Sequence, residues 1–529
     1  MAKSAKRTKA GTKKRAGRGL WLRLAEAGTL TLILGVTAWL AIRWHAAAGY
    51  TLYYGDAASH LAIARRILDS RTPGVFQIGS VWLPLPHLLM LPWISDDHLW
   101  RSGLAGAIPA AACFVLGGVF LYLAIHRWYE CRVAAGTAVL VYALNPNLLY
   151  LQAIPMTEPV LMAAIFGLLY AMVSYAKSGS VWAVLGGALA LNAASLTRYE
   201  GWFLTPFAAL FFWLGGKPRR FWHGLMFGTL ASAGPVWWLF HNWWFYGDIW
   251  YFFDGPYSAK AIYQRQLEAG MSRYPGDHDL ERALVQLRAA AELCAGSPLF
   301  WLGIAGSAVA VLWRAWLPMG LFLLPVIFYI LSIYSSGTPI FVPHLWPNSY
   351  YNIRYGFAAY PLLVLGAGSL VLPAPLRFRI AVAPAVVLIA ISQWIAYPRP
   401  ESWMVWKESQ VNSEARRAWT TQAAGYLREH YRPGSGVFGT LGDIASVYRE
   451  AGIPLKEVLH EGNHPHWNAA VARPDLFLWE EWAVAISGDS VATAILRAQR
   501  RGPRYVCVKM ISVKGAPVIE IYHRESREK

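Results

Sequence analysis

Charged residues are scarce in this chain. Asp, Glu, Lys and Arg make up only 15% of its 529 residues, whereas 56% are hydrophobic and 14% are aromatic. Soluble globular proteins usually carry about 25% charged residues. The composition therefore argues against an ordinary soluble enzyme of this length and indicates a membrane protein.

Cysteine is also rare, and the few cysteines are far apart. Cys113, Cys131, Cys294 and Cys507 form no C-x-x-C pair and no Cys/His ligand spacing. This pattern suggests neither a disulfide framework nor a zinc site. Cysteine is therefore not expected to carry the chemistry of this protein.

Negative charge is in short supply relative to positive charge, and the formal net charge is +18. The basic residues are scattered through short segments between apolar runs and are concentrated in residues 1–23. Basic residues in such places fix the orientation of a membrane protein, so no nucleic-acid partner is expected. Residues 1–23 are predicted to be a disordered, basic cytoplasmic tail.

Apolar runs without Asp, Glu, Lys or Arg recur throughout residues 24–396. A helix needs about 20 apolar residues to cross the hydrocarbon core, and each run is close to that length. They predict a polytopic α-helical membrane protein with about eleven transmembrane helices. The runs are 28–42, 102–125, 133–152, 159–175, 181–197, 201–216, 224–246, 298–313, 317–334, 356–372 and 380–396.

The loops between these runs predict the orientation, because Lys and Arg stay on the cytoplasmic side. A cytoplasmic N-terminus puts the short basic loops inside and nearly all acids outside. The protein is expected to be a multi-pass protein of the cytoplasmic (plasma) membrane with its C-terminus outside. The inside loops are 126–132, 177–180, 216–220, Arg314 and 375–379, and the outside segments are 43–101, 247–297, 335–355 and 397–529.

Two outside segments have a character of their own. Residues 80–94, SVWLPLPHLLMLPWI, are apolar but interrupted by prolines, which predicts a re-entrant or interfacial segment. Residues 397–529 regain charge and alternate helix and strand patterns, which predicts a small extracytoplasmic α/β domain. Its expected helices are 413–430 and 490–500, and its expected strands are GVFGT (436–440), YVCVKMI (505–511) and VIEIYHR (518–524).

Four polar clusters fall on the outer side of the predicted spans. In YYGDAASH, Asp56 and His60 are four residues apart and would share one face of a helix. The same segment also fits an amphipathic helix that lies on the membrane, and single charges near span ends also occur at ordinary interfaces. The other clusters hold Glu158 after the third span, Arg198 and Glu200 after the fifth, and Arg354 before the tenth.

In their order and sidedness these motifs resemble the GT-C glycosyltransferases. The resemblance rests on YYGD, IPMTEP, SLTRYEG and SYYNIRYG together with an outer C-terminal domain. It covers about residues 20–396 and is greatest for the branch with protein O-mannosyltransferases and the aminoarabinose transferase of lipid A. It implies that a sugar, a hexose or a pentose, moves with inversion from a polyprenyl-phosphate donor to an acceptor on the outer membrane face.

The resemblance also implies roles for particular residues. It places the catalytic carboxylate at Asp56 and gives Glu158 the role of orienting the acceptor or the base, while the helical spacing makes His60 the candidate partner of Asp56. Family members often show two adjacent acids there, whereas Ala57 follows here, so Asp56 is expected to act alone as the base. No cofactor is indicated, and a divalent metal is left open. The leaving phosphate needs cations, for which the candidates are Arg354, Arg198, Lys260 and Arg71.

Three further segments have alternative interpretations. FVPHLWPNSYYN (341–352) fits a slot for the donor or an aromatic belt at the membrane interface. WWFYGD (243–248) is similar to the WWD motif of oligosaccharyltransferases, but Phe245 replaces its acid, so interfacial aromatics are expected. His460, His464 and His466 lack the usual spacing of metal ligands, and no metal site is expected there.

Two other classes of function stay open on the sequence alone. A secondary transporter usually needs ionisable residues within its spans or inverted repeats, and the predicted spans show neither. A non-catalytic scaffold of a glycan assembly complex is the other alternative. The expected partners are the lipid-linked donor, membrane lipids, and a glycan, lipid or protein acceptor.

Overall fold

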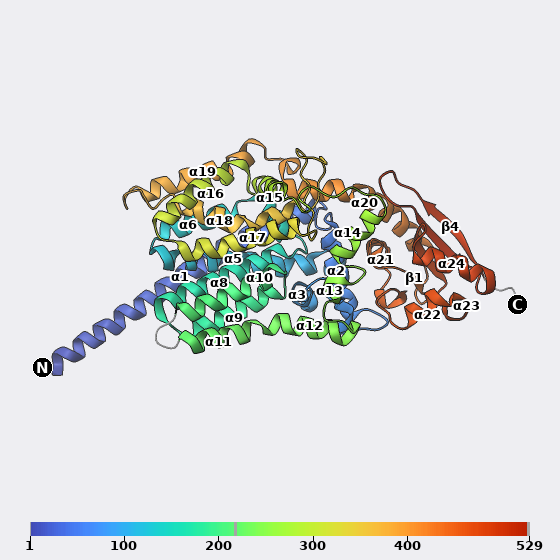
Figure 1. Ribbon diagram of the computed structural model, residues 1–529, viewed down its shortest axis with the longest axis horizontal. Helices are drawn as coiled ribbons and strands as arrows, with labels where there is room; N and C mark the ends of the chain where they lie inside the picture. The colour runs from blue at the N-terminus through green and yellow to red at the C-terminus, as the bar shows by residue number, and fades with distance from the viewer. Residues whose placement is uncertain (1, 216–219, 526–529) are drawn as a thin grey trace.

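The computed structural model of the protein describes residues 2–215 and 220–525, with the side chains of residues 25–215 and 221–525. A helical region is followed by a C-terminal region (residues 397–525) that contains a sheet. Figure 1 shows the sheet at one end of the helical region and the N-terminus beyond the other end. The side chains of the basic tail and most of the expected loop 216–220 lie outside the described residues.

Five described helices are long and apolar enough to cross a membrane, and they indicate a multi-pass membrane protein. The first is the second half of α1, because helix also runs through residues 2–23, which the sequence predicts to be disordered. Ala, Lys and Arg, which are frequent there, all have high helix propensity. The five are Ala25–Ala47 of α1 (Ala2–Ala47), α5 (Leu104–Tyr129), α8 (Glu158–Ser178), α17 (Trp316–Tyr334) and α19 (Arg379–Ala396).

Two helix pairs are broken, so the described residues contain up to seven spans if each pair counts as one. The predicted run 133–152 is bent by 70° between α6 (Arg132–Ala143) and α7 (Pro146–Gln152). Asn145 caps α7 by accepting from Leu148 N at 3.1 Å, and Pro146 suits a first helical turn. The other pair, α15 (Leu280–Ala295) and α16 (Ser297–Leu312), is bent by 109° at Gly296, where φ is 86°.

The remaining helices before residue 397 are shorter. The run predicted at 224–246 is divided into two helices at Ser232. Four of the shorter helices are apolar: α3 (Leu85–Ile94), α9 (Val181–Ser195), α10 (Glu200–Leu214) and α18 (Tyr360–Ser369). The others are α2 (Gly55–Leu68), η1 (Val75–Ile78), α4 (Asp97–Ser102), α11 (Arg220–Ala231), α12 (Ala233–Tyr246), α13 (Tyr251–Asp254), α14 (Ala259–Glu268) and η2 (Ile353–Ala358).

The C-terminal region contains a small mixed sheet in the order β2-β1-β3-β5-β4. The first three strands are parallel, and β5 runs antiparallel to both of its neighbours. The predicted elements are confirmed, except that the helix expected at 413–430 begins earlier. The elements are η3 (Pro400–Ser402), α20 (Met404–His430), β1 (Val437–Gly439), α21 (Ala445–Ala451), η4 (Leu455–Glu457), β2 (Val458–Leu459), α22 (His466–Ala472), α23 (Pro474–Phe477), β3 (Trp482–Ile486), α24 (Ser490–Arg501), β4 (Tyr505–Ile511) and β5 (Ile519–Arg524).

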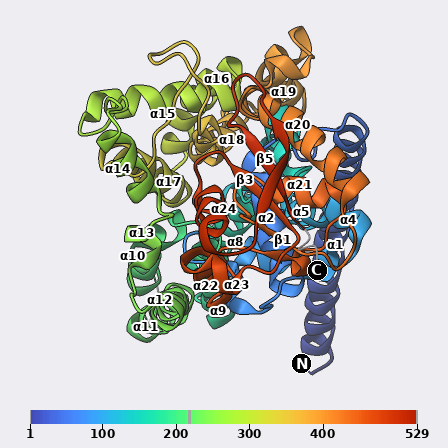
Figure 2. The ribbon, with the colours of Figure 1, turned by 90° about the vertical axis from the view of Figure 1, so that its right-hand side faces the viewer.

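Helix α2 is packed between the helical region and the sheet. Its Leu61 and Ala64 belong to one buried cluster with Trp419 of α20 and Val484 of β3. Figure 2 shows the sheet in front of the helical region, with α2 behind the strands. The helix therefore does not lie on a membrane surface, and the packing fixes the position of Asp56 in its first turn.

Candidate active site

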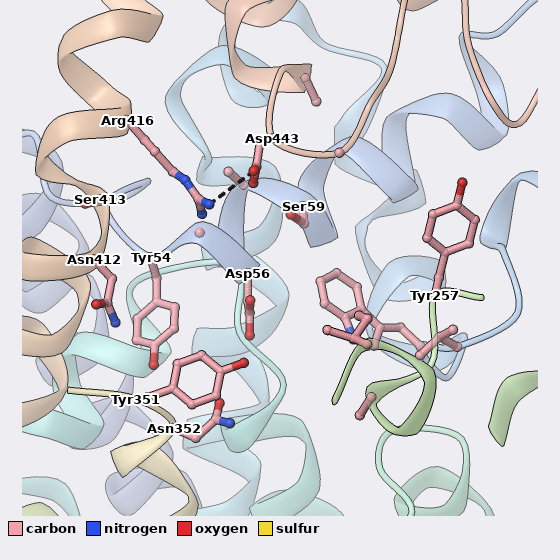
Figure 3. A pocket seen from close by; sticks show the side chains of 18 of the residues that line it. Tyr54, Asp56, Ser59, Tyr257, Tyr351, Asn352, Asn412, Ser413, Arg416 and Asp443 are labelled. Atoms are coloured by element: carbon pink, nitrogen blue, oxygen red, sulfur yellow. Dashed lines mark ion pairs between the residues drawn. The ribbon is translucent and has the colours of Figure 1, made fainter. Parts of the chain in front are cut away.

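A cavity of about 1590 Å³ lies where the helical region meets the C-terminal region. Its walls come from α2 and η1, from α13, α14 and residues 337–355, and from α20 and α21. In Figure 3, Asp56 lies between Asn412 and Ser413 of α20 on one side and Tyr257 on the other. Most small-molecule sites measure about 300–1,000 Å³, so this cavity has room for two substrates.

Asp56 faces the cavity from the first turn of α2, and 36% of its side chain is exposed. Its Oδ2 accepts a hydrogen bond from Nη2 of Arg354 in η2. Among the described residues, no hydrogen bond reaches Oδ1, so that oxygen is open to a bound molecule. Ser59, Ile63 and Arg66 line the cavity on the same face of the helix, in a 3-4-3 spacing.

Asp56 and four residues behind it form a charge network in which carboxylates and guanidinium groups alternate. Arg354 Nε lies 3.0 Å from Glu158 Oε1, and Arg198 Nη1 lies 2.8 Å from the same oxygen. Arg198 Nε is 2.9 Å from Glu200 Oε1. The side chains of Arg354 and Glu158 are only 6% and 5% exposed. Buried charges are costly unless they are paired, so each member of the network depends on its neighbours.

Tyrosine side chains surround the two arginines of the network. The Arg354 guanidinium lies over the Tyr54 ring at 4.7 Å, and the Arg198 guanidinium lies over the Tyr355 ring at the same distance. Tyr329 donates a hydrogen bond to Glu200 at 2.5 Å. Burial opposes the charge of Arg354, but the neighbouring Tyr54 and Asp56 outweigh it and raise the pKa of the guanidinium above its usual value. Arg354 is therefore a fixed positive charge beside Asp56.

Glu408 of α20 supports the network from the C-terminal region. Its carboxylate accepts from the Tyr54 hydroxyl at 2.5 Å and from the backbone N–H groups of Asn352 at 2.8 Å and Ile353 at 2.9 Å. Burial raises the pKa of the Glu408 carboxyl, although its hydrogen bonds act in the opposite direction. The sequence does not single out Glu408, because it is one of many charged residues on a long helix.

Three of the residues singled out in the sequence lie away from the cavity. His60 Nδ1 is 2.9 Å from His87 Nε2, and burial lowers the pKa of His60 to about 3, so its imidazole is neutral and not beside Asp56. Arg71 pairs with Glu480 at 2.6 Å. Lys260 is exposed and pairs with Asp254 at 2.6 Å. None of the three side chains lines the cavity.

Glu158 and Arg198 are brought together with Arg354 and Asp56, as their common position at span ends suggests, but they lie behind the cavity wall. Glu158 therefore contacts Arg354 rather than the cavity. Arg66, which the sequence did not single out, lines the cavity instead. Its Nε donates to the Gln77 carbonyl at 2.6 Å, and it forms no ion pair with any described carboxylate. In the sequence, Arg66 could have been identified by its spacing from Asp56, which puts both residues on the same face of α2.

The donor set does not fit a metal ion. The described residues include no group of three or more His, Cys, Asp or Glu side chains that could hold one. The space between the carboxylates of Asp56 and Glu158 is occupied by the Arg354 guanidinium. His460 is buried and accepts from Gly462 N at 3.0 Å.

The aromatic segment 341–352 lies along the cavity, to which it contributes Phe341, Trp346, Tyr350 and Tyr351. This position fits the slot interpretation better than a belt that only faces lipid. By contrast, Trp243 and Trp244 of the WWFYGD segment are 52% and 64% exposed on α12, in keeping with interfacial aromatics.

No family model matches the chain, and no curated protein matches it in sequence. The fold is similar to that of ArnT from Cupriavidus metallidurans bound to undecaprenyl phosphate, with a TM-score of 0.53 and 15% identity over 92% of this chain and 98% of that chain. For ArnT in the apo state the TM-score is 0.54 at 13% identity, with the same coverage. The apo oligosaccharyltransferase of Archaeoglobus fulgidus has a TM-score of 0.44 at 13% identity, over 87% of this chain and 69% of that chain. The similarity to ArnT confirms the predicted GT-C-like fold.

Proposed function

We propose that this protein is an integral-membrane glycosyltransferase that moves a hexose or a pentose from a polyprenyl-phosphate donor to an acceptor on the outer membrane face. One observation carries the proposal. Asp56 is the exposed end of an otherwise buried charge network, and it faces a cavity of about 1590 Å³. The GT-C-like fold supports the reaction type, and undecaprenyl phosphate in ArnT supports the class of carrier.

In this proposal Asp56 is the general base. The acceptor hydroxyl gives its proton to Oδ1 while its oxygen forms a new bond to the anomeric carbon of the sugar. The bond from that carbon to the phosphate oxygen breaks, and its electron pair stays on the phosphate. Attack and departure on opposite sides of the carbon invert its configuration. Arg354 holds Oδ2, so the base has one fixed and one open oxygen.

The departing polyprenyl phosphate is an anion and needs a cation in the cavity. Arg354 and Arg66 both line the cavity and are assigned this role. Arg66 is suited to it because it forms no close ion pair with a described carboxylate, although the nearby Glu461 acts on its charge. Arg198 lies between Glu158 and Glu200 and is assigned to holding the network, and the same holds for Glu158, which anchors Arg354.

The two ends of the cavity differ in chemistry, which suggests where each substrate binds. The rings of Tyr246 and Tyr251 stack at 4.6 Å and line the cavity together with Tyr257, and Tyr246 lies near Arg66. This aromatic wall suits an isoprenoid phosphate and its sugar. The α20 side offers polar groups such as Asn412, which suit a hydroxylated acceptor. Asp56 lies between the two sides, where the base must reach the acceptor hydroxyl (Figure 3).

The test compares wild type with Asp56→Asn in proteoliposomes. A panel of polyprenyl-phosphate sugars is supplied, released polyprenyl phosphate is measured, and the anomeric configuration of the product is read by NMR. Asn keeps the shape and removes the base, so kcat should fall by about 10²- to 10⁴-fold. Asp97→Asn is the matched control, because Asp97 is an acid of the same segment that pairs with Arg65 and does not line the cavity.

Loss of turnover in Asp56→Asn but not in Asp97→Asn supports both the reaction and the base. Equal rates in wild type and Asp56→Asn would keep the transferase and remove Asp56 as its base. No turnover by wild type with any donor would overturn the proposal in favour of a transporter or a scaffold.

A further inference from the structure

Glu408 holds the two chain segments that carry the reactive ion pair. It binds the backbone of Asn352 and Ile353, and the next residue along the chain is Arg354. It also binds the hydroxyl of Tyr54, which is two residues before Asp56. We infer that Glu408 is a positioning residue through which α20 of the C-terminal region aligns Arg354 with Asp56. This inference rests on the proposed transferase function.

The local geometry requires such a support. Asn352 has φ 57°, in the left-handed region that L-residues other than Asn rarely adopt. Asn352 is the residue before η2, and the Glu408 carboxylate accepts from the N–H groups of Asn352 and Ile353. The same carboxylate fixes the Tyr54 ring, and the Arg354 guanidinium rests on this ring at 4.7 Å. One carboxylate thus fixes both the backbone before Arg354 and the surface beneath its side chain.

A glutamine at this position cannot replace the carboxylate. The two carboxylate oxygens of Glu408 accept three hydrogen bonds. The residue is only 2% exposed, so water cannot replace a lost hydrogen bond there. A glutamine side chain has one acceptor oxygen and would turn its NH₂ group toward a donor. At least one of the three donors would therefore lose its partner.

Other contacts also join the C-terminal region to α2 and the segment after it, and they supply a control. Glu480 is buried and pairs with Arg71 at 2.6 Å, but it does not line the cavity. Glu408 and Glu480 are thus both buried acids of the C-terminal region that contact this part of the chain. They differ in that Glu408 lines the cavity and contacts residues next to Asp56 and Arg354, and Glu480 does neither.

The experiment compares Glu408→Gln with Glu480→Gln in full-length protein, in nanodiscs and with a donor that wild type turns over. Active sites are counted by binding of undecaprenyl phosphate, so that misfolded protein does not lower the measured rate. Glu408→Gln should lower kcat per site by about 10- to 100-fold, which corresponds to about 1.4–2.8 kcal/mol. The donor KM should stay within about threefold, and Glu480→Gln should keep kcat within about twofold while its melting temperature falls.

A double-variant cycle distinguishes positioning from a general loss of stability. If Glu408 acts through Asp56, Glu408→Gln should cost little further rate in the Asp56→Asn background. Additive losses, or an equal fall in kcat for Glu480→Gln, would overturn the inference.

The inference can be judged apart from the proposed function. If wild type turns over no donor, cryo-EM of Glu408→Gln still measures the contact between Arg354 and Asp56. Displacement of residues 352–354 with loss of that contact would support positioning. An unmoved segment with the contact intact would refute it.

Discussion

Replacement of Arg354 by lysine tests the charge network most directly. Arg354 Nη2 pairs with Asp56, and Nε lies 3.0 Å from Glu158. A planar guanidinium reaches two carboxylates at once, whereas a lysine ammonium is a point charge on a flexible stem. Arg354→Lys should therefore keep the charge and lose one charge-assisted contact, at about 1.5–3 kcal/mol. If that loss falls on the transition state, kcat drops by about 10- to 150-fold.

The assay is release of polyprenyl phosphate by proteoliposomes, with thermal unfolding measured in parallel. Arg354→Met removes the charge and should cost about 3–5 kcal/mol of stability, because the buried Glu158 carboxylate loses one of its two cationic partners. Arg65→Lys is the control, since Arg65 pairs with Asp69 and Asp97 away from the cavity, and its kcat should stay within about threefold of wild type. A wild-type kcat in Arg354→Lys, or an equal loss in Arg65→Lys, would refute the reasoning.

Four further outcomes are expected. Arg66→Gln should weaken binding of polyprenyl phosphate by about tenfold or more, measured by product inhibition, and unchanged inhibition would remove Arg66 from the phosphate site. Burial lowers the pKa of His60 from 6.5 to about 3, so below pH 6.5 only the unfolded chain takes up the proton. His60→Gln should flatten the resulting acid loss of stability, which is at most about 1.4 kcal/mol per pH unit, and an unchanged curve of melting temperature against pH would contradict this. Arg71→Gln leaves Glu480 unpaired and should cost about 1–3 kcal/mol of stability with kcat within about twofold, and a larger loss of kcat would return Arg71 to the site. Asp56→Asn should bind polyprenyl phosphate more tightly than wild type, which isothermal titration can measure, and weaker binding would argue against the coupling described below.

Hydropathy predicts the membrane character of the fold but not the shape of each span. A run of apolar residues shows that a segment avoids water, and α5 and α8 follow such runs closely. The run 133–152 is equally apolar, yet it bends by 70° because a cap at Asn145 starts a new helix. Similarly, the segment 247–297 that was predicted outside the membrane ends in α15, and the chain turns by 109° from α15 into α16. Capping and packing decide such breaks, and apolar length does not report them.

The order of motifs predicts which residues gather at the site, but not their partners. Asp56, Glu158 and Arg354 meet because each lies at the same end of its helix. Helical spacing alone predicts His60 beside Asp56, but the imidazole of His60 instead forms a hydrogen bond with His87 of α3. Glu408 approaches from a helix that starts after the last span, and no local pattern predicts a contact over that separation. Pairing across distant segments depends on tertiary packing, which the sequence motifs do not specify.

The contact between Arg354 and Asp56 couples the two halves of the proposed reaction. While Asp56 is ionised, its carboxylate pairs with Arg354 and partly neutralises the charge of the guanidinium. When Asp56 takes the proton of the acceptor, its carboxyl becomes neutral and no longer competes for the guanidinium. At that moment negative charge develops on the leaving phosphate, and Arg354 can interact with it more strongly, so the stabilisation appears mainly in the transition state. Asn at position 56 imitates the neutral carboxyl, which is why Asp56→Asn should lose turnover and yet bind polyprenyl phosphate more tightly.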